Sequence, residues 1–321
     1  MGCVCGKTQI YIEGRRFEIV ETLGEGGFSY VYLVQELRGN SWLPQRGKQW
    51  ALKKIDCHSQ RDECKAMAEV EMHKLMAECR YILPLEAYDL VKEADSATVY
   101  MLLPLYKKGT LLDELNRRGR RRKYIEEARV LRLFHDICSG VKALHMIKPH
   151  SYAHMDLKPG NVLLSDSDEA ILMDLGSAQL AQFDVPNAKE AQRLQDYAAE
   201  HCSMAYRAPE LFHINCGDYI TEKTDIWSLG CLLYAMCFFK SPFDLVHERG
   251  DSVALAVQSG KLEIPQKSPY SQFVHDLIQS MMQLDSDFRP DIMKILSQLE
   301  EHMEAKGISH VASPKSNTEQ L

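Results

Sequence analysis

The stretch HMDLKPGN, residues 154–161, is followed closely by AILMDLG, residues 170–176. Together they supply Asp156, Lys158 and Asn161 in one loop, and then an apolar run that ends in Asp174. Carboxylate and amide oxygens are the ligands that Mg²⁺ takes, and a lysine can neutralise a phosphate. The stretch is therefore either a loop that transfers phosphate or the remnant of one.

Upstream, residues 17–36 read FEIVETLGEGGFSYVYLVQE, which alternates apolar and polar residues around a glycine cluster. The pattern predicts a strand, a turn and a second strand. Gly24 and Gly26 permit positive φ and let backbone N–H groups approach a phosphate. Such a hairpin also occurs without any ligand. It is not a dinucleotide-binding turn, because a strand follows rather than a helix.

The next two segments are a strand and a helix. QWALKKI, residues 49–55, is a predicted strand that carries Lys53, which either reaches water or pairs with an anion. Residues 61–78 have helical spacing and contain Glu69 and Glu71. ATVYMLLPLY, residues 97–106, is predicted to be a strand that leads into a linker.

From Leu111 onward, helical periodicity dominates. Residues 125–145 form a predicted amphipathic helix that ends at His145. The apolar run LGCLLYAMCFF from Leu229 is too short to span a bilayer and suits a buried core helix.

Taken together, these motifs resemble the eukaryotic protein kinases from about Phe17 to Glu300. The resemblance implies an α+β, bilobal protein kinase fold. A small β-rich N-lobe with one key helix would span residues 17–103, and the hinge and a larger α-helical C-lobe would span residues 104–305. Residues 1–16 would form an N-terminal acylation segment. The polar tail, residues 306–321, is expected to be disordered.

The same resemblance implies the catalytic roles. Asp156 would accept the proton of a substrate hydroxyl, and Lys158 would neutralise the γ-phosphate as charge shifts. Asn161 and Asp174 would hold Mg²⁺ or Mn²⁺. Lys53 would contact the α- and β-phosphates of ATP.

Glu69 and Glu71 are the two candidates for the partner of Lys53. The alternative for each is a position on a solvated face of the helix. The similarity of EVEMHKL, residues 69–75, to the corresponding kinase helix favours Glu69. Leu103 would be the gatekeeper of the adenine pocket, and the linker from Pro104 would be the hinge. The residues expected to bind ATP are Leu23, Gly24, Glu25, Gly26, Gly27, Phe28, Ser29, Val31, Ala51, Lys53, Glu69, Leu103, Pro104 and Tyr106.

Three positions depart from the family pattern: Ser29, Met155 and Leu175. Met155 stands where the family has an arginine that pairs with a phosphorylated residue of the activation segment. One hypothesis is a kinase that is active without this phosphate. The alternative is a catalytically weak pseudokinase that acts as a membrane-tethered, ATP-binding scaffold. The complete set of charged residues favours the enzyme.

The activation segment contains PNAKEAQRLQDYAAEH, residues 186–201. Asn187 and Glu190 predict a capping box at the start of a helix. The residues that would share one face, or lie beside it, are Ala191, Leu194, Tyr197 and Ala198. The alternative is a mobile charged loop. Packing of such a helix would order the segment without phosphate.

Beyond this helix, Ser203 stands where serine/threonine kinases place a residue that touches the catalytic aspartate. This favours serine and threonine substrates. The resemblance also implies that Glu210 pairs with Arg289 and that Asp225 braces the catalytic loop.

LGEGGFSYV, MDLGS, YRAPELF, WSLGCLLYAM and GDSVALAVQ resemble the Numb-associated kinase family, and in particular a myristoylated and palmitoylated member of it. Members of that family carry a helix in the activation segment. The similar member keeps the arginine that Met155 replaces, so this chain is identified as a divergent homologue. The resemblance implies residence on the cytoplasmic face of Golgi or secretory-pathway membranes.

The N-terminus, MGCVCGK, offers Gly2 for myristate and Cys3 and Cys5 for palmitate. It is otherwise a short tail with two exposed thiols. A single myristoyl chain binds a membrane only marginally, so a second chain would decide residence.

The composition bounds the remaining possibilities. A formal net charge of -7 argues against a nucleic-acid partner. Ten scattered cysteines without metal-ligand spacing predict reduced, mostly buried thiols. The basic run RRGRRRK, residues 117–123, is either a solvated loop between two helices, a patch for anionic lipid or a nuclear import signal.

Overall fold

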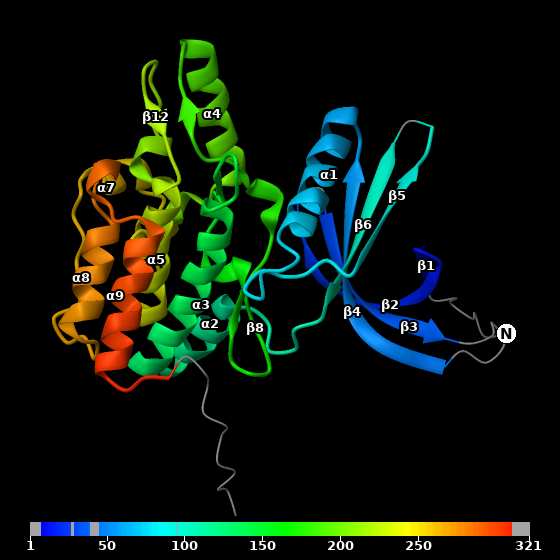
Figure 1. Cartoon of the computed structure of the whole chain (residues 1–321), viewed down its shortest axis with the longest axis horizontal. Helices are drawn as coiled ribbons and strands as arrows, with labels where there is room; N and C mark the ends of the chain where they lie inside the picture. Colours follow the sequence, from blue (N-terminus) through cyan, green and yellow to red (C-terminus); the bar gives the residue numbers. More distant parts are fainter. Residues whose placement is uncertain (1–7, 27–28, 39–44, 95, 310–321) are drawn as a thin grey trace, which may run out of the picture. The chain divides into compact units, whose positions relative to one another are not determined.

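The computed structural model describes residues 8–26, 29–38, 45–94 and 96–309 (Figure 1). It divides into two compact units. The first comprises Met1–Lys107 and Asp174–Gly176, and the second comprises Lys108–Met173 and Ser177–Leu321. The first is rich in strands and the second in helices, so the predicted α+β class is confirmed.

A six-stranded antiparallel sheet forms most of the first unit, in the order β1-β2-β3-β4-β6-β5. Helix α1 (Gln60–Leu75) packs against β4 and β6. The sheet's core contains Phe17, Trp50 and Leu102. The strands are β1 (Gln9–Ile12), β2 (Arg15–Glu25), β3 (Ser29–Arg38), β4 (Gln45–Cys57), β5 (Ala87–Lys92) and β6 (Ala97–Pro104).

Strand β1 differs from the sequence expectation, which placed residues 1–16 in an acylation segment. Gln9 pairs with Glu18 of β2, and Ile12 is fully buried in the sheet's core. The strand is the first arm of a tight hairpin, because Ile12 pairs with Arg15 and the two residues between them, Glu13 and Gly14, both adopt positive φ. Gly2, Cys3 and Cys5 lie outside the described residues.

Helices make up most of the second unit. They are α2 (Leu111–Arg121), α3 (Glu127–His145), α4 (Ala188–His201), α5 (Lys223–Phe238), α6 (Asp244–Glu248), α7 (Val253–Gln258), α8 (Gln272–Met281) and α9 (Ile292–Ala305). Helix α3 packs against α9 and α5, and α5 packs against α8. Short strands accompany them: β7 (Tyr152–Ala153), β8 (Val162–Leu164), β9 (Ala170–Leu172), β10 (Gln179–Leu180), β11 (Phe183–Asp184) and β12 (Tyr219–Ile220).

Two helix predictions in this unit are confirmed. Helix α3 ends at His145, and its buried face includes Val130, Phe134 and Val141. Helix α5 contains most of the apolar run from Leu229, and Leu229 to Leu233 and Ala235 to Cys237 are buried. A helix that is apolar all round belongs in a protein core.

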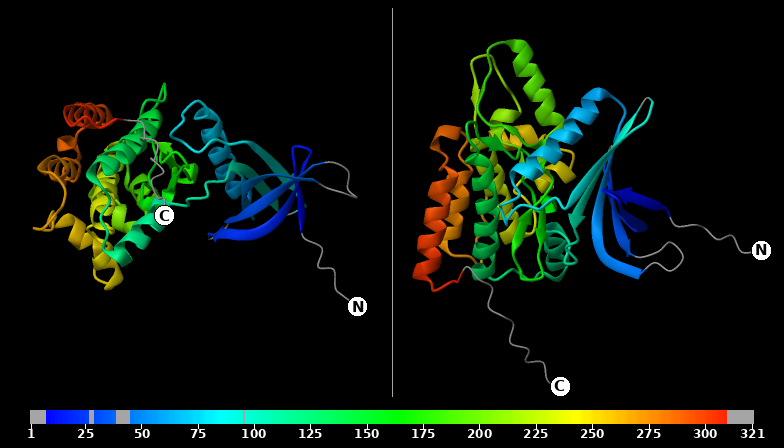
Figure 2. Two further views of the ribbon diagram at one scale, coloured as in Figure 1. Left: turned by 90° about the horizontal axis from the view of Figure 1, so that it is seen from below. Right: turned by 45° about the vertical axis from the view of Figure 1, so that its right-hand side comes forward.

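Helix α4 confirms the helix predicted inside the activation segment. The Asn187 side chain accepts a hydrogen bond from the Glu190 backbone N–H, at 3.0 Å, and so caps the first turn. The buried residues of the helix are Ala191, Leu194 and Ala198, the predicted face. Figures 1 and 2 show α4 beside β12 at one end of the second unit, and Arg193 of α4 covers the ring of Phe183 in β11, the partner strand of β12.

The thiols fit the expectation of reduced cysteines. The described cysteines are free, and five of them are buried: Cys57, Cys138, Cys202, Cys231 and Cys237. Burial raises the pKa of Cys202 to about 12, which keeps its thiol neutral. Within the described ranges, no helix is both long and apolar enough to cross a bilayer.

Candidate active site

In the first unit, Lys53 lies between two carboxylates. Its Nζ is 2.7 Å from Glu69 Oε1 and 2.9 Å from Asp174 Oδ1. Burial disfavours the charge on Lys53, but attraction to Glu69 and Asp174 outweighs it and raises the pKa of Lys53 above its usual value. The lysine is therefore charged and held in place by two acids from distant parts of the chain.

Glu69, not Glu71, is the partner of Lys53 in the structure. The Glu69 side chain is 5% exposed, whereas Glu71 is 64% exposed and pairs with Lys74 on the surface of α1. Gly176 faces the buried carboxylate closely, since a Cβ there would lie 3.1 Å from Glu69 Oε2. A larger residue at position 176 would push against the ion pair.

His73, one turn further along α1, lies behind Glu69 and was not singled out from the sequence. Its Nδ1 is 2.8 Å from the carbonyl oxygen of Leu83, and its Nε2 is 3.9 Å from Glu69 Oε1. Burial lowers the pKa of His73, so the ring is neutral and Nδ1 donates to the carbonyl. A histidine four residues after the acid was the available signal.

The glycine-rich turn connects β2 to β3. The Gly26 N–H donates to the Ser29 carbonyl oxygen at 2.7 Å, and a Cβ on Gly24 would meet nothing within 4 Å. Neither glycine adopts a positive φ, so the turn does not require glycine for its backbone angles. Gly27 and Phe28 lie outside the described residues.

The other residues expected near the nucleotide lie on the same sheet. Val31 is directly opposite Lys53, and Ala51 is opposite Leu103. Leu103 is buried at the end of β6, and Pro104 is the last residue of that strand. Leu23 and Glu25 are among the last three residues of β2, and Tyr106 follows β6.

In the second unit, Asp156 is the centre of a compact polar cluster. Its Oδ2 accepts from Lys158 Nζ at 2.7 Å and from Asn161 Nδ2 at 3.0 Å. Its Oδ1 accepts from the Ser203 backbone N–H at 2.9 Å, and Ser203 Oγ accepts from Lys158 Nζ at 2.7 Å. The predicted contact between Ser203 and Asp156 is thus present, although the backbone of Ser203 makes it.

Asp225 holds the backbone that precedes Asp156. Its carboxylate accepts from the backbone N–H groups of His154 and Met155, at 2.7 and 3.0 Å, and from His145 Nε2 at 2.9 Å. Met155 adopts φ +69, a costly angle for a residue with a side chain, and these bonds stabilise it. Burial opposes ionisation of Asp225, but hydrogen bonds from His145 and His154 outweigh it and lower its pKa.

The activation segment is fixed at both ends of α4. Tyr197 Oη donates to the Ser177 carbonyl oxygen at 2.9 Å. Arg207 Nη2 donates to the Cys202 carbonyl oxygen at 2.8 Å, at the negative end of α4. Sequence reasoning missed Arg207. Beyond it, Arg289 binds Glu210 through the two terminal guanidinium nitrogens, Nη1 and Nη2, at 2.7 and 2.8 Å.

The residues expected to hold a divalent cation have suitable chemistry. Asn161 uses its amide nitrogen on Asp156, which orients the amide and gives its oxygen a fixed direction. Asp174 is 44% exposed and adopts φ +61, so its carboxylate is accessible. Amide and carboxylate oxygens fit Mg²⁺ or Mn²⁺.

The β-rich unit contains a paired lysine, and the helical unit contains an aspartate–lysine–asparagine cluster. These features are typical of phosphotransferases. The family model described as the protein kinase domain matches residues 17–299. The chain is 44% identical over 298 residues to Serine/threonine-protein kinase 16 of Rattus norvegicus and to that of Homo sapiens, covering 93% of this chain and 94% of theirs. It is 36% identical to Serine/threonine-protein kinase ppk13 of Schizosaccharomyces pombe over 91% of this chain and 92% of that one.

The chain therefore belongs to the protein kinase family, among its serine/threonine kinases. Membership implies ATP and a divalent metal as cofactors in general.

Proposed function

We propose that this chain is an active, membrane-associated serine/threonine kinase that transfers the γ-phosphoryl group of ATP to protein hydroxyls. The observation that carries the proposal is the completeness of the charged set. Lys53 is paired with Glu69, and Asp156 is paired with Lys158 and Asn161, each at hydrogen-bonding distance. A scaffold that only binds ATP has no need for the second cluster.

Each residue has a defined task in this proposal. Lys53, oriented by Glu69, binds the α- and β-phosphates. Asp156 accepts the proton of the substrate hydroxyl as the oxygen attacks phosphorus, and Lys158 neutralises the transferred group. Asn161 and Asp174 hold the metal, which supplies charge neutralisation when it is bound.

We also propose that activity needs no phosphate on the activation segment. Met155 offers no cation for such a phosphate. Packing of Leu194 under α4, the Tyr197 hydrogen bond and the Arg207 contact hold the segment instead. These contacts, none of which is an ion pair, take the place of a charge pair.

The finer family assignment and the location are proposals of the same kind. The helix in the activation segment supports membership of the Numb-associated kinases. Gly2, Cys3 and Cys5 support myristoylation and palmitoylation, and with them residence on Golgi-type membranes. The intact mass of the protein from eukaryotic cells tests acylation, since an unmodified mass would contradict it.

The decisive experiment measures phosphate transfer from labelled ATP to a protein substrate, with Mg²⁺ or Mn²⁺. Asp174→Ala should lower the rate by at least about 100-fold, because a metal ligand and a partner of Lys53 are lost. Asp251→Ala, which removes an exposed carboxylate, is the matched control and should retain the wild-type rate. Equal incorporation by wild type and Asp174→Ala would reject the enzyme in favour of the scaffold.

A further inference from the structure

The basic segment, residues 117–123, has six basic residues in seven positions within a chain of net charge -7. The structure corrects the expectation of a solvated loop, because the first five residues are the last turns of α2. Arg122 adopts φ +51 and ends the helix, and its N–H and that of Lys123 donate to the terminal carbonyl groups of α2. The backbone of the segment is therefore ordered by these hydrogen bonds.

Aromatic packing holds this segment on the body of the second unit. Tyr124 stacks on Phe239 with ring centroids 5.3 Å apart, and it meets Tyr270 edge to face. Gly119 lies over the same ring, since a Cβ there would be 3.3 Å from Phe239 Cβ. The basic side chains thus extend from a fixed platform, which lowers the entropy cost of binding a ligand.

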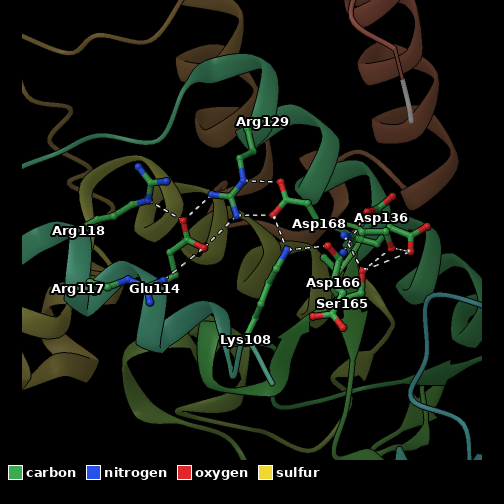
Figure 3. Close-up of polar contacts among 12 residues, drawn as sticks. Lys108, Glu114, Arg117, Arg118, Arg129, Asp136, Ser165, Asp166 and Asp168 are labelled. Carbon is green, nitrogen blue, oxygen red and sulfur yellow. Dashed lines mark hydrogen bonds and ion pairs between the residues drawn. The ribbon is translucent and has the colours of Figure 1, made fainter. Parts of the chain in front are cut away.

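An ion-pair network lies next to the segment and uses up the nearby acids (Figure 3). Glu114 accepts from Arg118 Nε at 2.6 Å and from both terminal nitrogens of Arg129, at 2.6 and 2.9 Å. Arg129 also binds Asp168, which Lys108 approaches to 3.8 Å. Figure 3 shows Arg129 between the two carboxylates, so within the basic segment Glu114 pairs closely with Arg118 alone and both acids are shared with Arg129.

A surface hollow of about 150 Å³ opens beside this network. Its lining residues are Glu114, Arg117, Arg118, Arg121 and Lys123. Arg118 is oriented by Glu114 and by the Tyr124 carbonyl oxygen, while Arg117 approaches Glu114 only to 4.0 Å. The hollow therefore has one fixed guanidinium and three further cations around a carboxylate that is already paired.

The exposed cations exceed what the helix requires. In the part of the chain that the structure describes, no ion pair joins Arg120, Arg121, Arg122 or Lys123 to a carboxylate. One or two cations in the last turn satisfy the negative end of a helix, and the effect falls off beyond that turn. Unpaired like charges repel each other, so an external anion would stabilise them.

We propose that the basic segment binds an anionic phospholipid surface and that the hollow receives the phosphate of one headgroup. Guanidinium groups match phosphate oxygens in a fork geometry. Tyr124, which directly follows the segment and is 44% exposed, has the apolar ring and polar tip that favour a membrane interface. The rest of the chain carries a net negative charge, so electrostatic attraction to such a surface comes from this segment.

The membrane also suits the rest of the chain better than a phosphorylated peptide does. One acyl chain gives marginal binding, and a polybasic patch is a recognised second signal. The cations surround a single small hollow, whereas an extended peptide would require a groove with backbone partners. The inference does not depend on phosphate transfer, because binding is measured without ATP.

The test uses the full chain produced in bacteria, so that no acyl group is attached, and vesicles of three compositions. These are phosphatidylcholine alone, with phosphatidylserine, and with a phosphatidylinositol phosphate. Wild type should bind both anionic vesicles, and the phosphoinositide more tightly. Arg117→Gln/Arg121→Gln/Lys123→Gln should weaken binding about 100-fold, at about fivefold for each basic residue near the surface.

Two further variants keep the result interpretable. Lys261→Gln/Lys294→Gln/Lys306→Gln removes the same charge from exposed positions outside the segment and should lose far less. Arg117→Lys/Arg121→Lys keeps the charge but removes the paired N–H donors of the guanidinium groups. It should therefore lose only the preference for the phosphoinositide. Unfolding temperatures near wild type show that each variant is folded.

Three outcomes would overturn the proposal. Equal losses in the two glutamine variants would mean that any positive charge suffices. If the lysine variant prefers the phosphoinositide as strongly as the wild type does, the proposal that the hollow binds the headgroup phosphate would be wrong. Tighter binding of a soluble phosphopeptide than of either anionic vesicle would assign the segment to a protein partner.

Discussion

The catalytic loop and the basic segment are two charged regions of the second unit, and they differ in whether their charges are paired within the protein. In the catalytic loop, Asp156 and Lys158 are 2.7 Å apart, and the bracing acid Asp225 is fully buried. In the basic segment only Arg118 makes a close ion pair, and the residues from Arg120 to Lys123 are exposed.

The difference separates two uses of a charged side chain. A buried, paired charge fixes its neighbours, because leaving either partner alone costs several kcal/mol. An exposed, unpaired charge contributes little to folding and remains available to an external ligand. Removing charges from the first region should therefore affect stability and turnover, and removing them from the second should affect binding.

The largest effect is expected from Asp225→Asn, which tests whether a buried, paired charge supports stability and turnover. An amide cannot accept from His145, His154 and Met155 together, and its NH₂ group would face a donor. We expect the free energy of unfolding to fall by about 3 kcal/mol. Turnover should fall as well, because the strained backbone before Asp156 loses its support.

Chemical denaturation and single-turnover kinetics measure the two effects. Asp251→Asn, at an exposed position, should change stability by less than about 0.5 kcal/mol and serves as the control. Wild-type stability and turnover in Asp225→Asn would show that the brace is unimportant.

The next effect concerns Glu114, the buried acid at the edge of the basic segment. Glu114→Gln should lower the free energy of unfolding by about 3 kcal/mol, because Arg118 and Arg129 lose a shared carboxylate. Burial opposes ionisation of Glu114, yet hydrogen bonds from the two arginines lower its pKa to about 2. The carboxylate is therefore ionised in the folded protein across the physiological range.

The pH dependence of this effect has a defined sign. A lowered folded-state pKa contributes stability above the unfolded pKa of about 4.3, and the contribution is lost as pH falls toward 2. The stability gap between wild type and Glu114→Gln should be constant above about pH 5 and shrink below it. Glu304→Gln, at an exposed position, should show no such gap.

The smallest effect is expected from phosphatase treatment. Because Met155 cannot bind a phosphate and α4 is held by packing, removing phosphate should change turnover by less than about twofold. Phosphate transfer before and after treatment, with intact mass to verify removal, measures this. Abolished activity after treatment would show that the packing of α4 and the contacts of Tyr197 and Arg207 do not suffice.

Local patterns predicted much of the fold. The capping residues and periodicity of residues 187–201 were enough to place α4, since Asn187 accepts a local hydrogen bond and three small or apolar residues share one face. The end of α3 at His145 followed in the same way. Strand β1 was missed because residues 1–16 were assigned to an acylation segment, although Glu13 and Gly14 form the two-residue turn of a local hairpin with β2.

For the candidate site too, some residues were predicted from the sequence and others were found only in the structure. The choice of Glu69 over Glu71 came from resemblance, since both lie on one helix and only burial separates them. His73 and Arg207 were missed because each acts through a backbone carbonyl group, of Leu83 and Cys202, and carbonyl positions have no signature in sequence.

The hydrogen bonds to Asp225 come from the backbone of Met155 and make no use of its side chain. In the proposed enzyme, the phosphate requirement and the proton acceptor would therefore depend on adjacent but separate residues. A substitution at position 155 would change the requirement while the backbone hydrogen bonds that hold Asp156 in place could still form.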